Sequence, residues 1–189
     1  MKKRTLVIII AIVAVVVLIG SIVGSYNGFV DKYEAVETAQ SNISTQLQRR
    51  ADLIPNFVNT VKGYSDYEKE TYTAVTEARS KVGSANTAAE QAEAAAGLNS
   101  AIDVWVNAIT EAYPELKANE NYLALQDNLE GTENRIAVAR KDYNDAVKEY
   151  NLKIKRFPGK LLAGIFGFDA AEYFEADDNA SSVPEVSFD

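Results

Sequence analysis

The sequence of 189 residues contains no cysteine and no histidine. These absences exclude disulfides, Cys/His zinc sites, thiolate and Ser–His nucleophiles, and haem bound through histidine. Basic residues are also scarce, since 19 lysines and arginines face 27 acidic residues, for a net charge of −8. This balance argues against a general nucleic-acid-binding protein, which needs cations to neutralise phosphates. We expect no metal, no cofactor and no nucleic-acid partner. An interaction protein, a membrane protein or an enzyme that uses carboxylates alone remains.

The charge is unevenly distributed along the chain. Residues 1–30 carry three basic and no acidic side chains, and residues 31–168 carry 16 basic and 20 acidic ones. Residues 169–189 carry seven acidic and no basic side chains. The length suits one modest domain together with an N-terminal segment. We therefore divide the chain into a basic N-terminus with an anchor (1–28), a folded domain (29–168) and an acidic C-terminal tail (169–189).

Residues 6–23 form an uncharged, apolar run of 18 residues. As a helix, the run would span roughly 27 Å, close to the ~30 Å hydrocarbon core of a bilayer. Tyr26 and Phe29 follow at the depth where aromatic rings settle in the interface. A cleaved signal peptide or a buried core helix are the alternatives, but a signal peptide usually has a shorter apolar region. The run predicts a single transmembrane anchor, with the lipid bilayer as a partner.

Basic residues beside the predicted span set its expected orientation. Lys2, Lys3 and Arg4 precede the span, whereas only Lys32 appears within the next 20 residues. The positive-inside rule then places the N-terminus in the cytoplasm. We expect a single-pass protein of the cell membrane whose folded domain is extracytoplasmic.

Gly20, Gly24 and Gly28 recur every four residues near the end of the span. Small residues at this spacing share one helix face and let two transmembrane helices approach closely. We therefore predict a self-association face that packs against identical copies, giving a homo-oligomer. The alternative is a flexible exit from the membrane, in which Asn27 and Gly28 unwind the helix.

The rest of the chain has the periodicity of helices. Apolar and small side chains recur every three or four residues in runs that span residues 29–47, 54–82, 98–112 and 122–150. Asp52 is a candidate cap for a helix that continues through Pro55, and breaks are expected at Gly83 and Ser84 and between Tyr113 and Pro114. We found no strand pattern. The sequence predicts an all-α protein with an N-terminal transmembrane helix followed by an antiparallel bundle of long helices, packed as in coiled coils.

Five strings carry a family resemblance. They are QRRADLIPNFVNTVKGY (48–64), YPELKANENYLALQ (113–126), TENRIAVARKDYNDAVKEYN (132–151), FPGKLLAGIFGF (157–168) and EYFEA (172–176). In this order they closely resemble the LemA family, from residue 26 to the tail. The resemblance implies a transmembrane helix and a helical bundle, without an established biochemical activity. The sequence departs from the family pattern at Gln40, often tryptophan, and at Ala51 and Tyr67, often histidine, so chemistry that needs those histidines is not expected.

Two groups of polar residues are candidates for a shared site. One surrounds the expected junction near Pro55 and the other lies on the last long helix: Arg49, Arg50, Asp52, Asn56, Glu133, Asn134, Arg135 and Asn144. They could form a convergent site in which carboxylates bind or activate a ligand. They could instead form a buried network of ion pairs and amides that fixes the register of the helices. Because no nucleophile, metal pattern or phosphate loop accompanies them, we favour the structural network and expect no catalytic residues.

Residues 157–168 are rich in large apolar side chains and carry a single charge, Lys160. The residues expected to make contacts are Phe157, Lys160, Leu161, Leu162, Ile165, Phe166 and Phe168. The segment could fold back and cover one end of the bundle. Alternatively it could contact a membrane or a protein partner, with its aromatic and leucine side chains in the headgroup region and nearby lysines on anionic lipid.

These features favour a non-enzymatic, membrane-anchored scaffold that self-assembles and organises or remodels membrane. The alternative is an adaptor that binds a membrane protein partner, such as a peptidase system. An enzyme would require a pocket with convergent carboxylates, which no pattern in the sequence demands.

Overall fold

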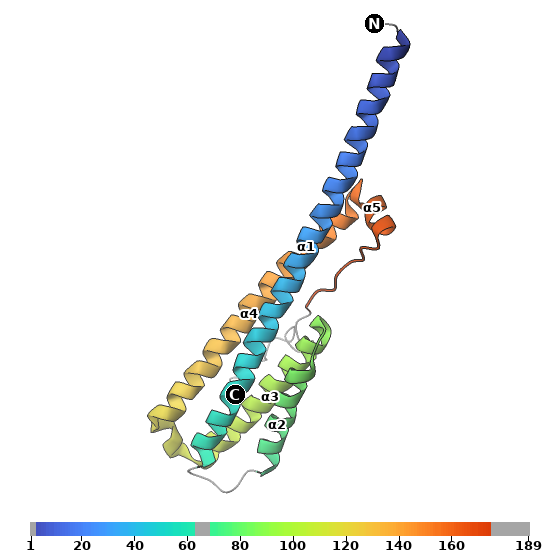
Figure 1. The fold of residues 1–189 in the computed structure, drawn as a ribbon. Coiled ribbons are helices and arrows are strands. Elements are labelled where there is room, and N and C mark those ends of the chain that lie inside the picture. Colours follow the sequence, from blue (N-terminus) through green and yellow to red (C-terminus); the bar gives the residue numbers. More distant parts are fainter. Residues whose placement is uncertain (1–2, 63–68, 175–189) are drawn as a thin grey trace, which may run out of the picture. The chain divides into compact units, whose positions relative to one another are not determined.

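The computed structural model describes residues 3–62 and 69–174, with side chains described for 3–61 and 73–174. Its elements are α1 (Lys3–Lys62), α2 (Lys69–Ser84), α3 (Ala88–Ala112), the 3₁₀ helix η1 (Pro114–Ala118), α4 (Glu120–Lys155) and α5 (Gly159–Phe166) (Figure 1). All elements within the described ranges are helices and none is a strand. The predicted all-α class, with a long apolar N-terminal helix, is confirmed.

Helix α1 is continuous where the sequence suggested interruptions. A helix start at Asp52 is wrong, and so is unwinding at Asn27 and Gly28, because α1 runs from Lys3 to Lys62 with Pro55 inside it. Proline removes a helical hydrogen bond and usually costs ~3 kcal/mol in a helix interior. Ile54 and Phe57, on either side of Pro55, are buried, and burying such a side chain stabilises by about 1.5–3 kcal/mol. Tertiary packing therefore outweighs the local signal.

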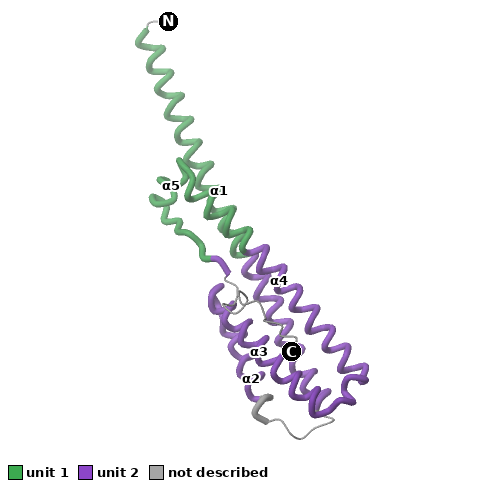
Figure 2. The backbone as a smooth tube through the Cα atoms, turned by 180° about the vertical axis from the view of Figure 1, so that it is seen from behind, with its two compact units in different colours: residues 1–38, 144–172 green, residues 39–143, 173–189 purple. Residues whose placement is uncertain are grey.

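The described residues form two compact units (Figure 2). Unit 1 contains residues 3–38 and 144–172. Unit 2 contains residues 39–62, 69–143 and 173–174. The long helices α1 and α4 each contribute residues to both units, whereas α2 and α3 belong to unit 2 and α5 belongs to unit 1.

Unit 2 is a helical bundle with an aromatic centre. The ring of Phe57 on α1 lies 5.0 Å from the ring of Trp105 on α3 and 5.2 Å from that of Tyr122 on α4. The Tyr122 hydroxyl is hydrogen-bonded to that of Thr110 at 2.9 Å. Farther toward the N-terminus of α1, Arg50 pairs with Glu133, farther along α4. Residues nearer the N-terminus of α1 therefore contact residues nearer the C-terminus of α4. This order is the one expected of the predicted antiparallel packing.

The predicted breaks around α3 are confirmed and have local causes. Helix α2 ends at Ser84, and α3 begins after Thr87, whose hydroxyl accepts from the backbone N–H of Glu90. The Glu90 carboxylate accepts in return from the backbone N–H groups of Asn86 and Thr87, which lowers its pKa. This capping box satisfies backbone donors that no helical carbonyl can reach. The stabilisation from ionised Glu90 is present above its unfolded-state pKa and is lost as the pH falls through the lowered folded-state pKa.

The other end of α3 is set by proline. The helix ends at Ala112, and Tyr113, with an extended φ of −131°, joins it to η1, which starts at Pro114. A residue before proline is disfavoured in the helical region, so the direction of the chain changes here.

Replacing Thr87 tests the contribution of the capping box. We expect Thr87→Ala to lower the free energy of unfolding by about 1 kcal/mol, because the Glu90 N–H loses its acceptor. Urea unfolding of the full-length protein in detergent, followed by the fluorescence of the buried Trp105, measures the change. Thr45→Ala is the matched control, since Thr45 is exposed inside α1 and only bonds the Ser41 carbonyl one turn back. Equal losses in the two variants would contradict the assignment.

Candidate functional site

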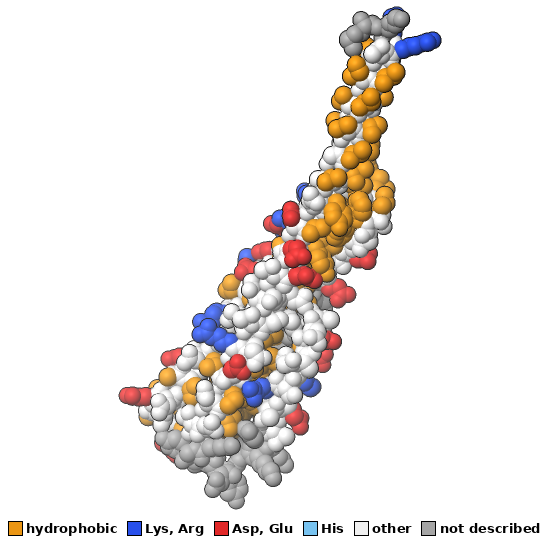
Figure 3. Space-filling model, in the orientation of Figure 1, with side chains coloured by type: hydrophobic (Ala, Val, Ile, Leu, Met, Phe, Trp, Pro, Cys, Tyr) orange, Lys and Arg blue, Asp and Glu red, His pale blue; other side chains and the backbone are white. Residues whose placement is uncertain are grey.

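The first part of α1 exposes apolar side chains on all sides. Residues 6–10, 12, 13, 15–19 and 23 are large, apolar and exposed, and none of the most apolar 18-residue window is buried. Figure 3 shows hydrophobic side chains along the visible face of this part of α1. The helix is long and apolar enough to cross a membrane. A helix that is apolar all round and unburied is typical of a membrane span rather than of a core helix.

An aromatic cluster forms where α1 leaves this span. The ring of Tyr26 meets those of Phe166 and Phe168 edge-on, with centroid distances of 5.1 and 5.7 Å. The ring of buried Phe29 lies 5.3 Å from that of Phe168. These contacts hold α5 and the residue pair that follows it against α1, within unit 1.

Two glycines allow this arrangement. A Cβ on Gly159 would lie 2.5 Å from the Lys153 carbonyl oxygen and 3.5 Å from the Phe29 ring, so a larger residue cannot start α5 here. Gly167 ends α5 in the left-handed conformation, with a φ of 75°. The turn lets the Phe168 N–H donate to the Ala163 carbonyl at 3.0 Å and directs the chain back toward Phe29.

The segment 157–168 has one packed side and one exposed side. Phe168 and Leu162 are half-buried, and Phe166 contacts Tyr26. Phe157, Leu161 and Ile165 are 82, 62 and 75 % exposed. Their spacing of four residues places the last two on one face of α5, with Phe157 just before its first turn. Lys160 is also exposed. Some residues of the segment therefore pack on α1, and Phe157, Leu161 and Ile165 form an exposed apolar row in the described part of the chain. Contact of this row with a membrane or a protein stays a prediction.

The chain that follows α5 is fixed to α4. The Tyr150 hydroxyl donates to the Asp169 carbonyl at 2.8 Å. The buried Asn151 side chain forms two hydrogen bonds with Ala171, donating to its carbonyl and accepting from its N–H, each at 2.9 Å. Burial raises the pKa of Tyr150, with smaller contributions from Tyr33 and Asp169. The start of the predicted acidic tail is thus packed within unit 1, and residues 175–189 lie outside the described residues.

A family model for the LemA family matches residues 39–188. The chain belongs to the LemA family. It is 28 % identical to magnetosome protein MamQ 1 of Paramagnetospirillum magneticum over 94 % of its own length and 76 % of that protein. It is 26 % identical to protein LemA of Metamycoplasma hominis over 85 % of its length and 76 % of that protein. The resemblance noted in the sequence is confirmed, and the LemA-family chain is a membrane-associated helical protein.

Two of the positions at which this LemA-family chain departs from the family pattern are described by the structure. Gln40 donates from Nε2 to the Asn86 carbonyl at 2.9 Å, and Ala51 is buried in unit 2. Tyr67 lies outside the described residues.

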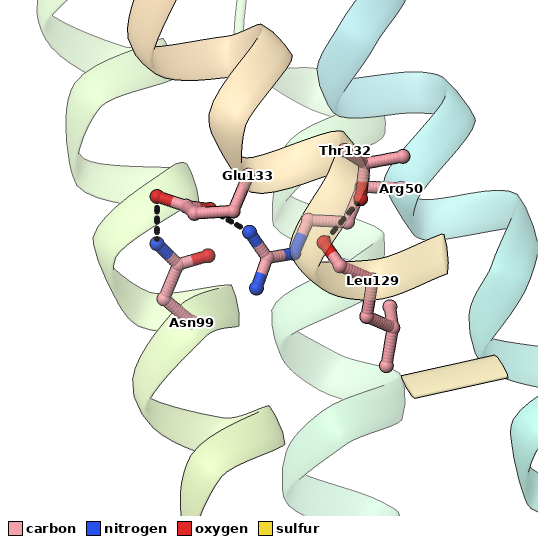
Figure 4. Close-up of polar contacts among 5 residues, drawn as sticks. All are labelled: Arg50, Asn99, Leu129, Thr132 and Glu133. Atoms are coloured by element: carbon pink, nitrogen blue, oxygen red, sulfur yellow. Dashed lines mark hydrogen bonds and ion pairs between the residues drawn. The ribbon is translucent and has the colours of Figure 1, made fainter. Parts of the chain in front are cut away.

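A buried polar cluster lies inside unit 2 (Figure 4). Arg50 is only 5 % exposed and forms an ion pair with Glu133, whose other oxygen accepts from Asn99 Nδ2 at 3.1 Å. Burial lowers the pKa of Arg50, while nearby Asp103 opposes this effect. The guanidinium stays charged, since arginine keeps its proton in proteins. The cluster links α1, α3 and α4 within unit 2.

The other residues of the predicted network lie elsewhere. Asp52 accepts from Gln48 Nε2 at 2.9 Å and pairs with Arg79 at 3.7 Å, both on the surface. The remaining members are exposed, or half-buried in the case of the last: Arg49, Asn56, Asn134, Arg135 and Asn144. The structure therefore joins Arg50 and Glu133 directly and adds a residue that the prediction missed, Asn99. Within the described residues, no group of three acidic side chains is placed to hold a metal ion.

Removing the partner of Arg50 tests the buried pair. We expect Glu133→Ala to lower the free energy of unfolding by about 3 kcal/mol, because it leaves a buried guanidinium without its carboxylate. The adjacent, exposed Asn134 provides the control, and Asn134→Ala should change the value by less than about 0.5 kcal/mol. Urea unfolding followed by Trp105 fluorescence compares the two variants. A Glu133→Ala effect as small as that of the control would show that the pair does not stabilise the fold.

Proposed function

We propose that this LemA-family protein is a non-enzymatic, membrane-anchored scaffold that self-assembles and organises or remodels the membrane. The observation that carries the proposal is the exposed apolar row of Phe157, Leu161 and Ile165. The segment that bears this row packs on α1 just after the span, where Phe166 contacts Tyr26. The row gives the chain a second apolar surface at the depth of the lipid interface.

Insertion of this row into the bilayer surface would be favourable. Burying a large apolar side chain stabilises by about 1.5–3 kcal/mol. Lys153, Lys155, Arg156 and Lys160 are exposed around the start of α5, and each cation near an anionic surface contributes about 1 kcal/mol. A shallow apolar wedge enters only one leaflet, so many copies side by side would expand that leaflet and bend the membrane.

The span offers a face for contact between copies. Apart from the adjacent residues and the backbone of α1 itself, no atom in the described part of the chain lies within 4 Å of a Cβ built on Gly20 or Gly24. In contrast, a Cβ on Gly28 would lie 2.9 Å from Nζ of Lys153. The proposed self-association therefore centres on Gly20 and Gly24, where helix backbones can approach in lipid.

The proposed topology follows the distribution of basic residues. The N-terminus would lie in the cytoplasm of a single-pass cell-membrane protein, and the helical bundle would be extracytoplasmic. The Arg50 cluster supports a non-enzymatic role, because its charges are used to join helices. An adaptor for a membrane protein partner, such as a peptidase system, is the alternative function.

A single-cysteine label tests whether α5 enters the bilayer. The native chain has no cysteine, so Ile165→Cys accepts one bimane probe in the full-length protein. In vesicles we expect blue-shifted emission and strong quenching by brominated lipid, because residue 165 would lie among lipid tails and headgroups. Glu34→Cys is the control, since Glu34 is exposed on α1 about 16 Å beyond Val23. If both probes report water, α5 does not insert.

A bulky residue on the glycine face tests self-assembly. We expect Gly24→Ile to reduce the oligomer to smaller species in mild detergent, because the side chain keeps the helix backbones apart. Val15→Ile is the control, since it lies about 180° around the helix from Gly24. Sedimentation of the two variants and the native protein measures their size. A native protein that is already a small, uniform particle would contradict the scaffold and favour the adaptor.

A further inference from the structure

A pocket of about 380 Å³ opens in unit 1 where α1 leaves the span. Its lining is shared by α1, the end of α4 and the turn before α5: Ser25, Phe29, Lys32, Glu149, Leu152, Lys153, Arg156, Phe157, Pro158 and Gly159. We infer that this pocket binds the phosphate headgroup of an anionic phospholipid. The inference rests on the membrane anchor of the proposed function, but it does not depend on self-assembly.

The charges that line the pocket match an anion. Three cations and one carboxylate line it. Lys32 is already paired with Glu149 at 2.5 Å. Lys153 and Arg156 form no ion pair with an acidic side chain in the described part of the chain, and both are exposed at the pocket. An ammonium and a guanidinium fork on one wall suit a phosphate group, which accepts hydrogen bonds on several oxygens.

The pocket lies at the depth of lipid phosphates. Ser25 follows Val23, the end of the apolar run, by two residues, and Lys32 follows it by nine. The helical rise then places the pocket between about 3 and 14 Å beyond the run. Each headgroup layer adds roughly 5–8 Å to the hydrocarbon core, so the two depths overlap. Phe29, Leu152 and Phe157 give the same pocket apolar walls, which suit the glycerol and upper acyl chain of a lipid better than they suit free phosphate.

Gly28 positions one of the two cations. Lys153 lies across the backbone of α1 at this residue, since a Cβ on Gly28 would be 2.9 Å from Nζ and 3.0 Å from Cε. An alanine would force the end of this flexible side chain to move, while helix α1 itself would be favoured by the substitution. Gly28→Ala therefore displaces the ammonium without changing the net charge.

Lipid titration of the full-length protein in a non-ionic detergent tests the pocket. Native mass spectrometry and calorimetry would measure binding of dioctanoyl phosphatidylglycerol, dioctanoyl phosphatidylcholine and glycerol 3-phosphate. We expect one saturable phosphatidylglycerol per chain, with much weaker binding of the other two. Equal binding of phosphatidylcholine would overturn the role of charge. Equal binding of glycerol 3-phosphate would overturn the assignment to a lipid.

Matched variants separate a defined pocket from diffuse attraction. Lys153→Gln with Arg156→Gln should weaken phosphatidylglycerol binding by roughly 30-fold. Lys155→Gln with Lys160→Gln removes the same charge from neighbouring residues outside the pocket, and should weaken binding by less than about threefold. Gly28→Ala should weaken it several-fold with unchanged helicity. Equal losses in the two double variants, or native affinity in Gly28→Ala, would overturn the inference.

Failure of the pocket and failure of the proposed function have different signatures. Loss of saturable lipid binding, with the residue 165 probe still quenched in vesicles, would overturn the pocket alone. Saturable binding of phosphatidylglycerol, with an unquenched probe at residue 165, would support the pocket and contradict the proposed insertion of α5 into the bilayer surface.

Discussion

The structure depends on one uninterrupted helix whose surface changes character along its length. Helix α1 is apolar on all sides over residues 6–19, and beyond Phe29 only one stripe of it is buried. Such a helix must face lipid over its first part and other helices over its second. In unit 1 the stripe receives α4 and the segment around α5, and in unit 2 it receives α3 and α4. The side chains of α3, α4 and the segment around α5 therefore have to fit between the buried side chains of α1.

Features with a local cause could be predicted from the sequence. The apolar run, the spacing of buried positions in α3 and α4, and the breaks at Ser84 and Pro114 all depend on residues close together in the chain. The helix start at Asp52 failed for the opposite reason. Proline and a capping residue are local signals, whereas Phe57 is buried against Trp105 of α3 and Tyr122 of α4, far away in sequence.

The polar site illustrates the same limit. Arg50 and Glu133 were singled out, but the amide that completes their cluster, Asn99, lies in an alanine-rich segment. The spacing of Asn99 and Asp103, one turn apart on α3, was the available signal that both share a face. A buried arginine must find its partners in a fixed register, because an unpaired charge inside a bundle is costly. The cluster joins three helices within unit 2, and an alignment that separated Arg50 from Glu133 would leave a buried charge unpaired.

Residue Asn151 has a consequence for the energetics of membrane contact. By holding Ala171 on α4, it closes the segment 157–171 into a loop with both ends attached to the same helix. An isolated helix of eight residues would be unfolded in water and would lose part of any binding energy to ordering. Here α5 is already folded before it meets a ligand or a surface. In the proposed membrane contact, α5 would therefore meet the lipid as a folded helix whose loop is held to α4 at both ends, and not as a free peptide.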